Sequence, residues 1–158
     1  MVLGSRLVIA TAVVATLAGC GSKRIPGTDI RDTRDTRAIV SVIDQYRIAA
    51  ERRDADGVLA LVSTRYFDDA GTADPADDQD YEQLRKRLPD DYARLTSVKL
   101  GMGVKAIDVT GDTATADVFF DGHWRLATKS GEVPKQTSDV NRMKFVREDG
   151  AWRIVSGL

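Results

Sequence analysis

Two residue types that often carry chemistry occur only once each in this chain of 158 residues: one cysteine, Cys20, and one histidine, His123. A single thiol cannot form an intramolecular disulfide or a thiolate metal cluster, and a single histidine cannot supply a site built from several imidazoles. Asp121 lies two residues before His123, and a carboxylate at that spacing on a strand face can orient an imidazole or raise its pKa. His123 and Asp121, with Asp139 further along the chain, are therefore the candidates for proton transfer.

The alternation of residues around His123 argues against a catalytic role for it. Phe120 and Trp124 share one parity of an extended segment, whereas Asp121 and His123 occupy the other. Because successive side chains on a strand point to opposite faces, an apolar parity in the core places Asp121 and His123 toward solvent. Only a bulge at Gly122 would reverse this facing. The sequence therefore favours a domain with no catalytic residue, and the proton-transfer set remains the alternative.

Polar and aromatic residues of the predicted core are candidates for binding a ligand. Asp139 and Asn141 lie at alternate positions with the apolar Met143 and so point to the same face of the strand. They are either polar groups inside the domain or solvent-exposed groups at its opening. Tyr46 and Tyr66 either place their rings around a ligand or are core residues with a satisfied hydroxyl. The candidate binding set is Tyr46, Tyr66, Phe120, Trp124 and Asn141.

An aspartate-rich segment spans residues 68–80. Its spacing lacks the glycine and the distal glutamate of an EF-hand calcium loop. Asp77, Asp78 and Asp80 are better explained as favourable charge at the N-terminus of a helix. We therefore expect no bound metal and no cofactor. The balance of 23 Lys plus Arg against 24 Asp plus Glu also argues against a nucleic-acid partner, which requires a clear basic excess.

The first residues have the layout of an export signal. Arg6 precedes an uncharged run from Leu7 to Leu17, shorter than the roughly 20 apolar residues that span a bilayer. The run ends in Leu17-Ala18-Gly19-Cys20, which resembles the lipobox of bacterial lipoproteins. In that family the cysteine thiol receives a diacylglycerol, and the signal peptide is removed before it. The resemblance implies a signal peptide over residues 1–19 and attachment to the membrane through a lipid on Cys20.

The segment that follows is expected to join the lipid to a folded domain. Residues 21–28 combine Gly, Ser and Pro without an apolar period, so residues 20–35 are predicted to be the lipid anchor and a flexible tether. Gly21 stands where the enteric signal for inner-membrane retention has Asp. The expected location is therefore the bacterial cell envelope, at the outer membrane and facing the periplasm.

The rest of the chain changes from a helical to a strand period near residue 96. Apolar spacing predicts a helix over residues 36–53, a short second helix that Asp54 caps, and a third over residues 81–88 that Pro89 interrupts. Alternation predicts strands over residues 98–109, 114–126, 136–147 and 152–155. The apolar parity changes near Lys105-Ala106, which predicts a β-bulge and a bend. Helices followed by an antiparallel meander indicate an α+β fold.

The order and spacing of these elements resemble the nuclear transport factor 2-like superfamily. Residues 145–155 are similar to its closing hairpin, and residues 54–62 are similar to its opening. The resemblance covers residues 36–158 and implies three N-terminal helices packed on a strongly curved, mostly antiparallel sheet, the cystatin-like cone. Many members of the superfamily form homodimers through this sheet.

This superfamily includes steroid isomerases, dehydratases and polyketide cyclases as well as binding and assembly modules, so the fold does not decide the function. We expect a non-catalytic module that binds a small apolar molecule in the cone or a protein partner on its surface. The alternative is a small isomerase, cyclase or dehydratase that uses an acid–base residue in the cone.

Overall fold

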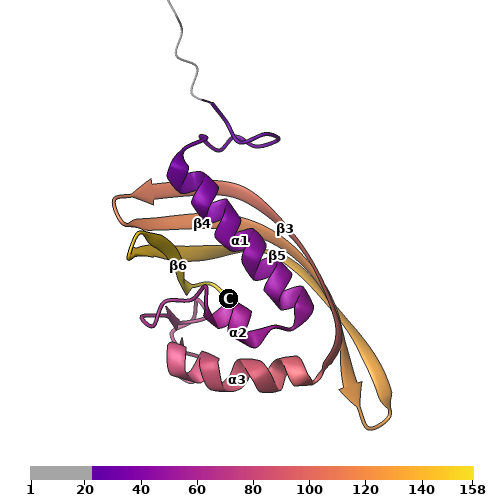
Figure 1. Cartoon of the computed structure of the whole chain (residues 1–158). Coiled ribbons are helices and arrows are strands. Elements are labelled where there is room, and N and C mark those ends of the chain that lie inside the picture. The colour runs from indigo at the N-terminus through magenta and orange to yellow at the C-terminus, as the bar shows by residue number, and fades with distance from the viewer. Residues whose placement is uncertain (1–22) are drawn as a thin grey trace, which may run out of the picture.

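The structure, a computed structural model, describes residues 23–158, so the predicted signal peptide and Cys20 lie outside the described residues. The elements are α1 (Arg34–Arg52), α2 (Ala55–Leu59), β1 (Phe67–Asp68), β2 (Gln79–Asp80), α3 (Tyr81–Ala93), β3 (Leu95–Thr110), β4 (Thr113–Thr128), β5 (Gly131–Glu148) and β6 (Ala151–Ser156). β3 to β6 form one antiparallel sheet in sequence order, and β1 and β2 form a separate two-stranded sheet. Figure 1 shows the larger sheet curving around α1. The predicted α+β fold with a curved antiparallel sheet is confirmed.

Helix α1 packs an apolar stripe against the concave side of the sheet. It begins at a capping box, in which the Thr33 side chain accepts from the backbone N–H of Thr36 and the Thr36 hydroxyl accepts from the N–H of Thr33. This box places the start of the helix two residues before the predicted one. Ile39, Val42 and Ile43 recur at helical spacing and are buried in the core.

Helix α3 is longer than predicted. Pro89 does not end it, and the helix continues to Ala93. A proline inside a helix removes one backbone hydrogen bond. The side chains of Leu88 and Tyr92, on either side of Pro89, pack against the core and hold the last turn in place. Tertiary packing therefore outweighs the local effect of the proline here.

The other two local predictions about turns and bends are confirmed. Asp54 caps α2, because its side chain accepts from the backbone N–H of Gly57 at 2.8 Å. The pairing of β3 with β4 shifts by one residue between Val104 and Ala106, which is the predicted bulge. Met102 before the bulge and Ile107 after it both pack against the core as a result.

Strand β5 extends further than predicted. It begins at Gly131, five positions before the predicted start, and all of its residues from 131 to 142 are exposed. β6 pairs with residues 144–148 of β5. Figure 1 shows the β4–β5 hairpin reaching beyond the helices. The inner face of the sheet is therefore covered near β6 and open toward that hairpin.

A charged contact ties the start of α1 to the end of β5. Arg147 Nη2 lies 2.9 Å from Asp35 Oδ1, and the Arg147 guanidinium lies 4.6 Å from the centre of the Trp152 ring. Trp152 Nε1 donates to the same Asp35 oxygen at 3.3 Å. The hydrogen bond from Arg147 lowers the pKa of Asp35. This contact fixes α1 across the sheet at one end.

Residues 23–32, which belong to the predicted tether, form a small hairpin. Arg24 and Arg31 make a β-bridge, and Ile30 between them is buried. In this part of the chain the Ile30 side chain is therefore covered rather than exposed to solvent. Of the helices in residues 23–158, none combines the length and the apolar character needed to cross a bilayer.

Candidate functional site

The concave face of the sheet borders an inner cavity of about 120 Å³. Tyr46 of α1 faces it from one side, and side chains of β3, β4 and β5 form the other walls. Apolar groups dominate this lining. The residues around the inner cavity are Tyr46, Leu100, Met102, Val118, Phe120, Asn141, Met143, Gly157 and Leu158.

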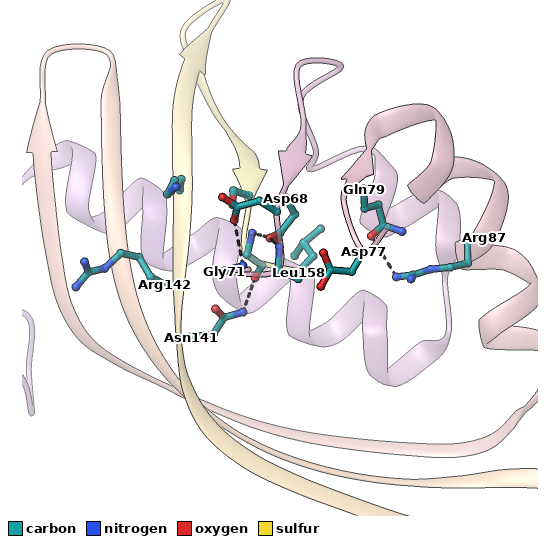
Figure 2. Close-up of a pocket in the computed structure, with 13 residues that line it drawn as sticks. Asp68, Gly71, Asp77, Gln79, Arg87, Asn141, Arg142 and Leu158 are labelled. Atoms are coloured by element: carbon teal, nitrogen blue, oxygen red, sulfur yellow. Dashed lines mark hydrogen bonds between the residues drawn. The ribbon is translucent and has the colours of Figure 1, made fainter. Parts of the chain in front are cut away.

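A second, open space adjoins the inner cavity and is polar. This outer basin has a volume of about 500 Å³, and its walls come from residues 68–79, from α3 and from β5. Figure 2 shows Asp77, Gln79 and Arg87 on one side of the basin and Asn141 on the other, with Leu158 between them. Asn141, Gly157 and Leu158 line both spaces. These three residues therefore form the partition between the inner cavity and the outer basin.

Hydrogen bonds hold the partition in place. The backbone N–H of Gly157 donates to Asp68 Oδ2 at 2.6 Å, and Asn141 Nδ2 donates to the carbonyl of Gly157 at 3.0 Å. The Tyr66 hydroxyl donates to the same Asp68 oxygen at 3.1 Å. It also accepts from the backbone N–H of Leu158 at 3.4 Å. Both backbone groups of Gly157 thus have side-chain partners.

Two tyrosines of this region are held as neutral phenols. Burial raises the pKa of Tyr46. Burial and the charge of Asp68 raise the pKa of Tyr66. An apolar environment disfavours the phenolate, and a neighbouring carboxylate disfavours it further. Both hydroxyls therefore act as hydrogen-bonding groups at neutral pH.

The first proton-transfer candidates lie on the outer face of the sheet. His123 Nε2 is 3.2 Å from Asp121 Oδ2, and their side chains are 54% and 50% exposed. β4 pairs with β5 in one unbroken register, so no bulge at Gly122 turns His123 inward. The buried parity of β4 includes Val118, and His123 belongs to the opposite parity. His123 and Asp121 are therefore in contact, but their side chains point away from the inner cavity.

The remaining predicted residues divide between the cavity and its surroundings. Tyr46, Phe120 and Asn141 line the inner cavity. Tyr66 is buried beside the partition.

Asp139 and Trp124 share the inward parity but lie outside the lining. Asp139 pairs with Phe120, is exposed, and accepts the backbone N–H of Val140 at 2.7 Å. The Trp124 ring lies over Gly122, where an added Cβ would be 2.9 Å from it.

Sequence reasoning missed Asp68, Gly157 and Leu158. Asp68 lies in the aspartate-rich segment and does not stand out within it, and the two residues after the last strand carry no motif. One signal was present, a glycine directly after an apolar strand. Gly157 has φ of +95°, and a Cβ there would lie 2.5 Å from the carbonyl oxygen of Arg142. Only glycine fits so close to β5.

Residues 23–158 contain no cluster of three or more His, Cys, Asp or Glu side chains that could hold a metal ion. Asp77, one of the acidic residues, accepts the Thr72 hydroxyl. Asp80 caps α3 by accepting the backbone N–H of Gln83 at 2.8 Å.

The raised pKa values of Tyr46 and Tyr66 predict a loss of stability at high pH. The unfolded chain titrates its tyrosines near pH 10, below the folded state, so the stabilising contribution is complete below about pH 10 and falls as the pH rises above it. In urea unfolding between about pH 8 and pH 11, Tyr46→Phe should flatten this decline. Tyr66→Phe should flatten it and also cost about 1 kcal/mol at neutral pH, because the bond to Asp68 is lost. A decline as steep as that of the unmodified chain in both variants would contradict the assignment.

Comparisons with known proteins identify the fold. No family model matches the chain, and no curated protein matches it. A ketosteroid isomerase-like protein from Erwinia carotovora atroseptica is 13% identical with a TM-score of 0.65, over 80% of this chain and 95% of that one.

Two further similar structures are of proteins described as proposed dehydratases. A proposed dehydratase of the NTF2-like family from Streptomyces avermitilis is 17% identical with a TM-score of 0.58, over 78% of this chain and 93% of that one. A proposed scytalone dehydratase from Novosphingobium aromaticivorans is 14% identical with a TM-score of 0.64, over 78% and 80% of the two chains. The curved sheet, the helix across it and these likenesses together show that this chain has the nuclear transport factor 2-like fold.

Proposed function

We propose that this protein is a lipid-anchored envelope protein whose cone binds a small apolar molecule without transforming it. The observation that carries the proposal is the inner cavity, which lies between α1 and the sheet and has a mostly apolar lining. In this proposal the three helices α1, α2 and α3 form the helical side of the cone, as in the superfamily that the sequence resembles.

The size of the inner cavity limits what fits within it. An engineered apolar cavity of roughly 150 Å³ stays dry and binds benzene. The inner cavity, at about 120 Å³, is close to that size. A single aromatic ring or a short branched alkyl group is therefore the expected occupant when the partition is in place.

The lining supports binding rather than proton transfer. Among the described residues, those around the inner cavity have no carboxylate or imidazole side chain. The Tyr46 hydroxyl is the most acidic side-chain group there, and burial raises its pKa further. A neutral phenol and the amide of Asn141 can orient a polar atom, but neither is a base at neutral pH.

A small isomerase, cyclase or dehydratase is the second candidate. The observation in its favour is the likeness in fold to an isomerase-like protein and to proposed dehydratases. Asp139 would be its carboxylate, because its parity on β5 is that of Asn141 and Met143. Its exposure places it outside the dry part of the cone, where a general base gains little from desolvation.

Binding can be tested at two natural reporters. The chain has three methionines, and two of them, Met102 and Met143, line the inner cavity. In the full chain labelled with ¹³C at the methionine methyl groups, benzene should shift both signals in a saturable manner. Leu100→Trp, which fills the cavity, should abolish the shifts. Leu126→Trp, on the same sheet face but outside the lining, should leave them intact; shifts absent from the unmodified chain would refute the binding function.

The anchor can be tested by labelling. Cells that carry the full chain and are fed alkyne-tagged palmitate should attach the label to this protein, because the proposed anchor is a lipid on Cys20. Several acyl chains on one residue give stable membrane attachment. Cys20→Ser should remove the label completely, and Ser22→Ala should keep it. Labelling that persists in Cys20→Ser would show that Cys20 is not the lipidated residue.

The outer face of the sheet supports a homodimer. Phe119 and Val140 pair across β4 and β5, and they are 38% and 54% exposed. Gly103 pairs with Phe119 from β3 and adds no side chain, and the Lys105 ammonium lies 5.5 Å from the centre of the Phe119 ring. We propose that two copies pack these faces together, which would bury the exposed apolar groups.

Sedimentation equilibrium tests this arrangement. The unmodified chain should be a dimer, and Val140→Lys should shift it to a monomer because the lysine charge would be desolvated between the sheets. Val133→Lys is the matched control, since Val133 is also exposed but shares the inner parity of Asp139. A dimer that persists in Val140→Lys would place the interface elsewhere.

A further inference from the structure

We propose that Leu158 is a gate, and that the ligand is an apolar molecule bearing an amide or hydroxyl group that displaces it. This inference rests on the proposed function of the inner cavity and adds its route of access and its ligand class. Leu158 lines both the inner cavity and the outer basin, so its removal joins them into one continuous site. The joined site would have room for a molecule larger than a single ring.

The backbone around Gly157 is shaped to hold Leu158 at this point. Gly157 approaches β5 so closely that a Cβ would lie 2.5 Å from the Arg142 carbonyl oxygen and 2.9 Å from the Met143 Cα. Leu158 is half-buried and packs against the core. The segment is therefore fitted to the strand, while its side chain is only partly covered and can leave.

The partners of Gly157 define the polar chemistry of the ligand. Asn141 donates to its carbonyl, and Asp68 accepts from its N–H. Figure 2 shows Asp68 and Asn141 next to Leu158, with dashed lines for these hydrogen bonds. When the segment leaves, Asn141 at the mouth of the cavity loses its acceptor, and Asp68 keeps the Tyr66 hydroxyl but loses its other donor. A ligand that offers an acceptor and a donor together, as an amide or a hydroxyl does, replaces both.

The shape of the site defines the rest of the ligand. The apolar end would occupy the inner cavity against Met102, Phe120 and Met143. The polar end would lie at the partition, and any further polar extension would reach the outer basin. Gly157 and Leu158 themselves present this combination, a peptide amide followed by an isobutyl group. The gate thus resembles the molecule that replaces it.

The binding of two probes, phenylacetamide and benzene, distinguishes an effect of the Leu158 gate from an effect of the inner cavity. Benzene fits the inner cavity while Leu158 is in place, whereas phenylacetamide needs the position of the Gly157 peptide. In the methionine-labelled full chain, Leu158→Ala should strengthen phenylacetamide binding by about tenfold, because a closed gate reduces the apparent affinity by the fraction of molecules that are open. The same variant should not strengthen benzene binding, because benzene fits the inner cavity with Leu158 in place and the variant removes part of the cavity wall.

Two further variants keep the test specific. Leu126→Ala, the matched loss of a leucine from the same sheet but outside the lining, should change neither affinity. Adding Asn141→Leu to Leu158→Ala should weaken phenylacetamide by about fivefold, since one hydrogen bond is lost, and should weaken benzene, which makes no such bond, much less. Circular dichroism at the working temperature confirms that each variant is folded.

The outcomes separate the two proposals. If benzene binds but phenylacetamide binds equally to the unmodified chain and to Leu158→Ala, the gate is wrong and the cavity stands. If the added Asn141→Leu weakens both probes alike, the amide recognition is wrong. If neither probe shifts Met102 or Met143 in any variant, the binding function itself is wrong.

Discussion

Strand β4 pairs along its length with β3 on one side and β5 on the other, and its alternation is the constraint on which the rest of the structure depends. Ala114, Ala116 and Val118 are all almost completely buried, so the side chains on one face of this strand lie in the core. A slip of one residue would expose that whole set and bury the charged parity instead. The single-residue bulge in β3 accommodates the bend without disturbing β4.

Curvature and cover then divide the inner face into two environments. Near β6 the helices cover it, and residues such as Val118 and Met143 are buried. Toward the β4–β5 hairpin the cover ends, Phe120 is half-buried and Asp139 is exposed, although all share one face. Chemistry that needs a dry environment is therefore confined to the covered part. That part contains the inner cavity, and the polar side chains around it are a phenol and an amide.

Features that depend on neighbouring residues were predictable from the sequence, and features that depend on distant ones were not. The capping of α2 by Asp54, the bulge in β3 and the outward facing of His123 follow from spacing alone. The end of α3 was placed too early, because Leu88 and Tyr92 hold the turn beyond Pro89 only through tertiary contacts. The bond between Asp68 and Gly157 joins residues 89 positions apart. No local pattern reports such a contact, which is why the partition of the site was missed.

The composition of the partition suits an exchange between protein and ligand. Hydrogen bonds contribute only about 1 kcal/mol each in net terms, and a ligand that supplies equivalent partners restores them almost in full. Burying a whole leucine side chain contributes roughly 1.5–3 kcal/mol, so a half-buried one contributes about half of that. Opening the partition would also break the two Gly157 bonds, so it would cost on the order of 3 kcal/mol in total and leave fewer than about one molecule in a hundred open. A fully apolar seal of the same size would gain no compensating bonds from the ligand. A partition built from one half-buried leucine and the Gly157 peptide bonds to Asp68 and Asn141 is thus closed at rest, and a ligand with an apolar end and one amide or hydroxyl can replace both of its interactions.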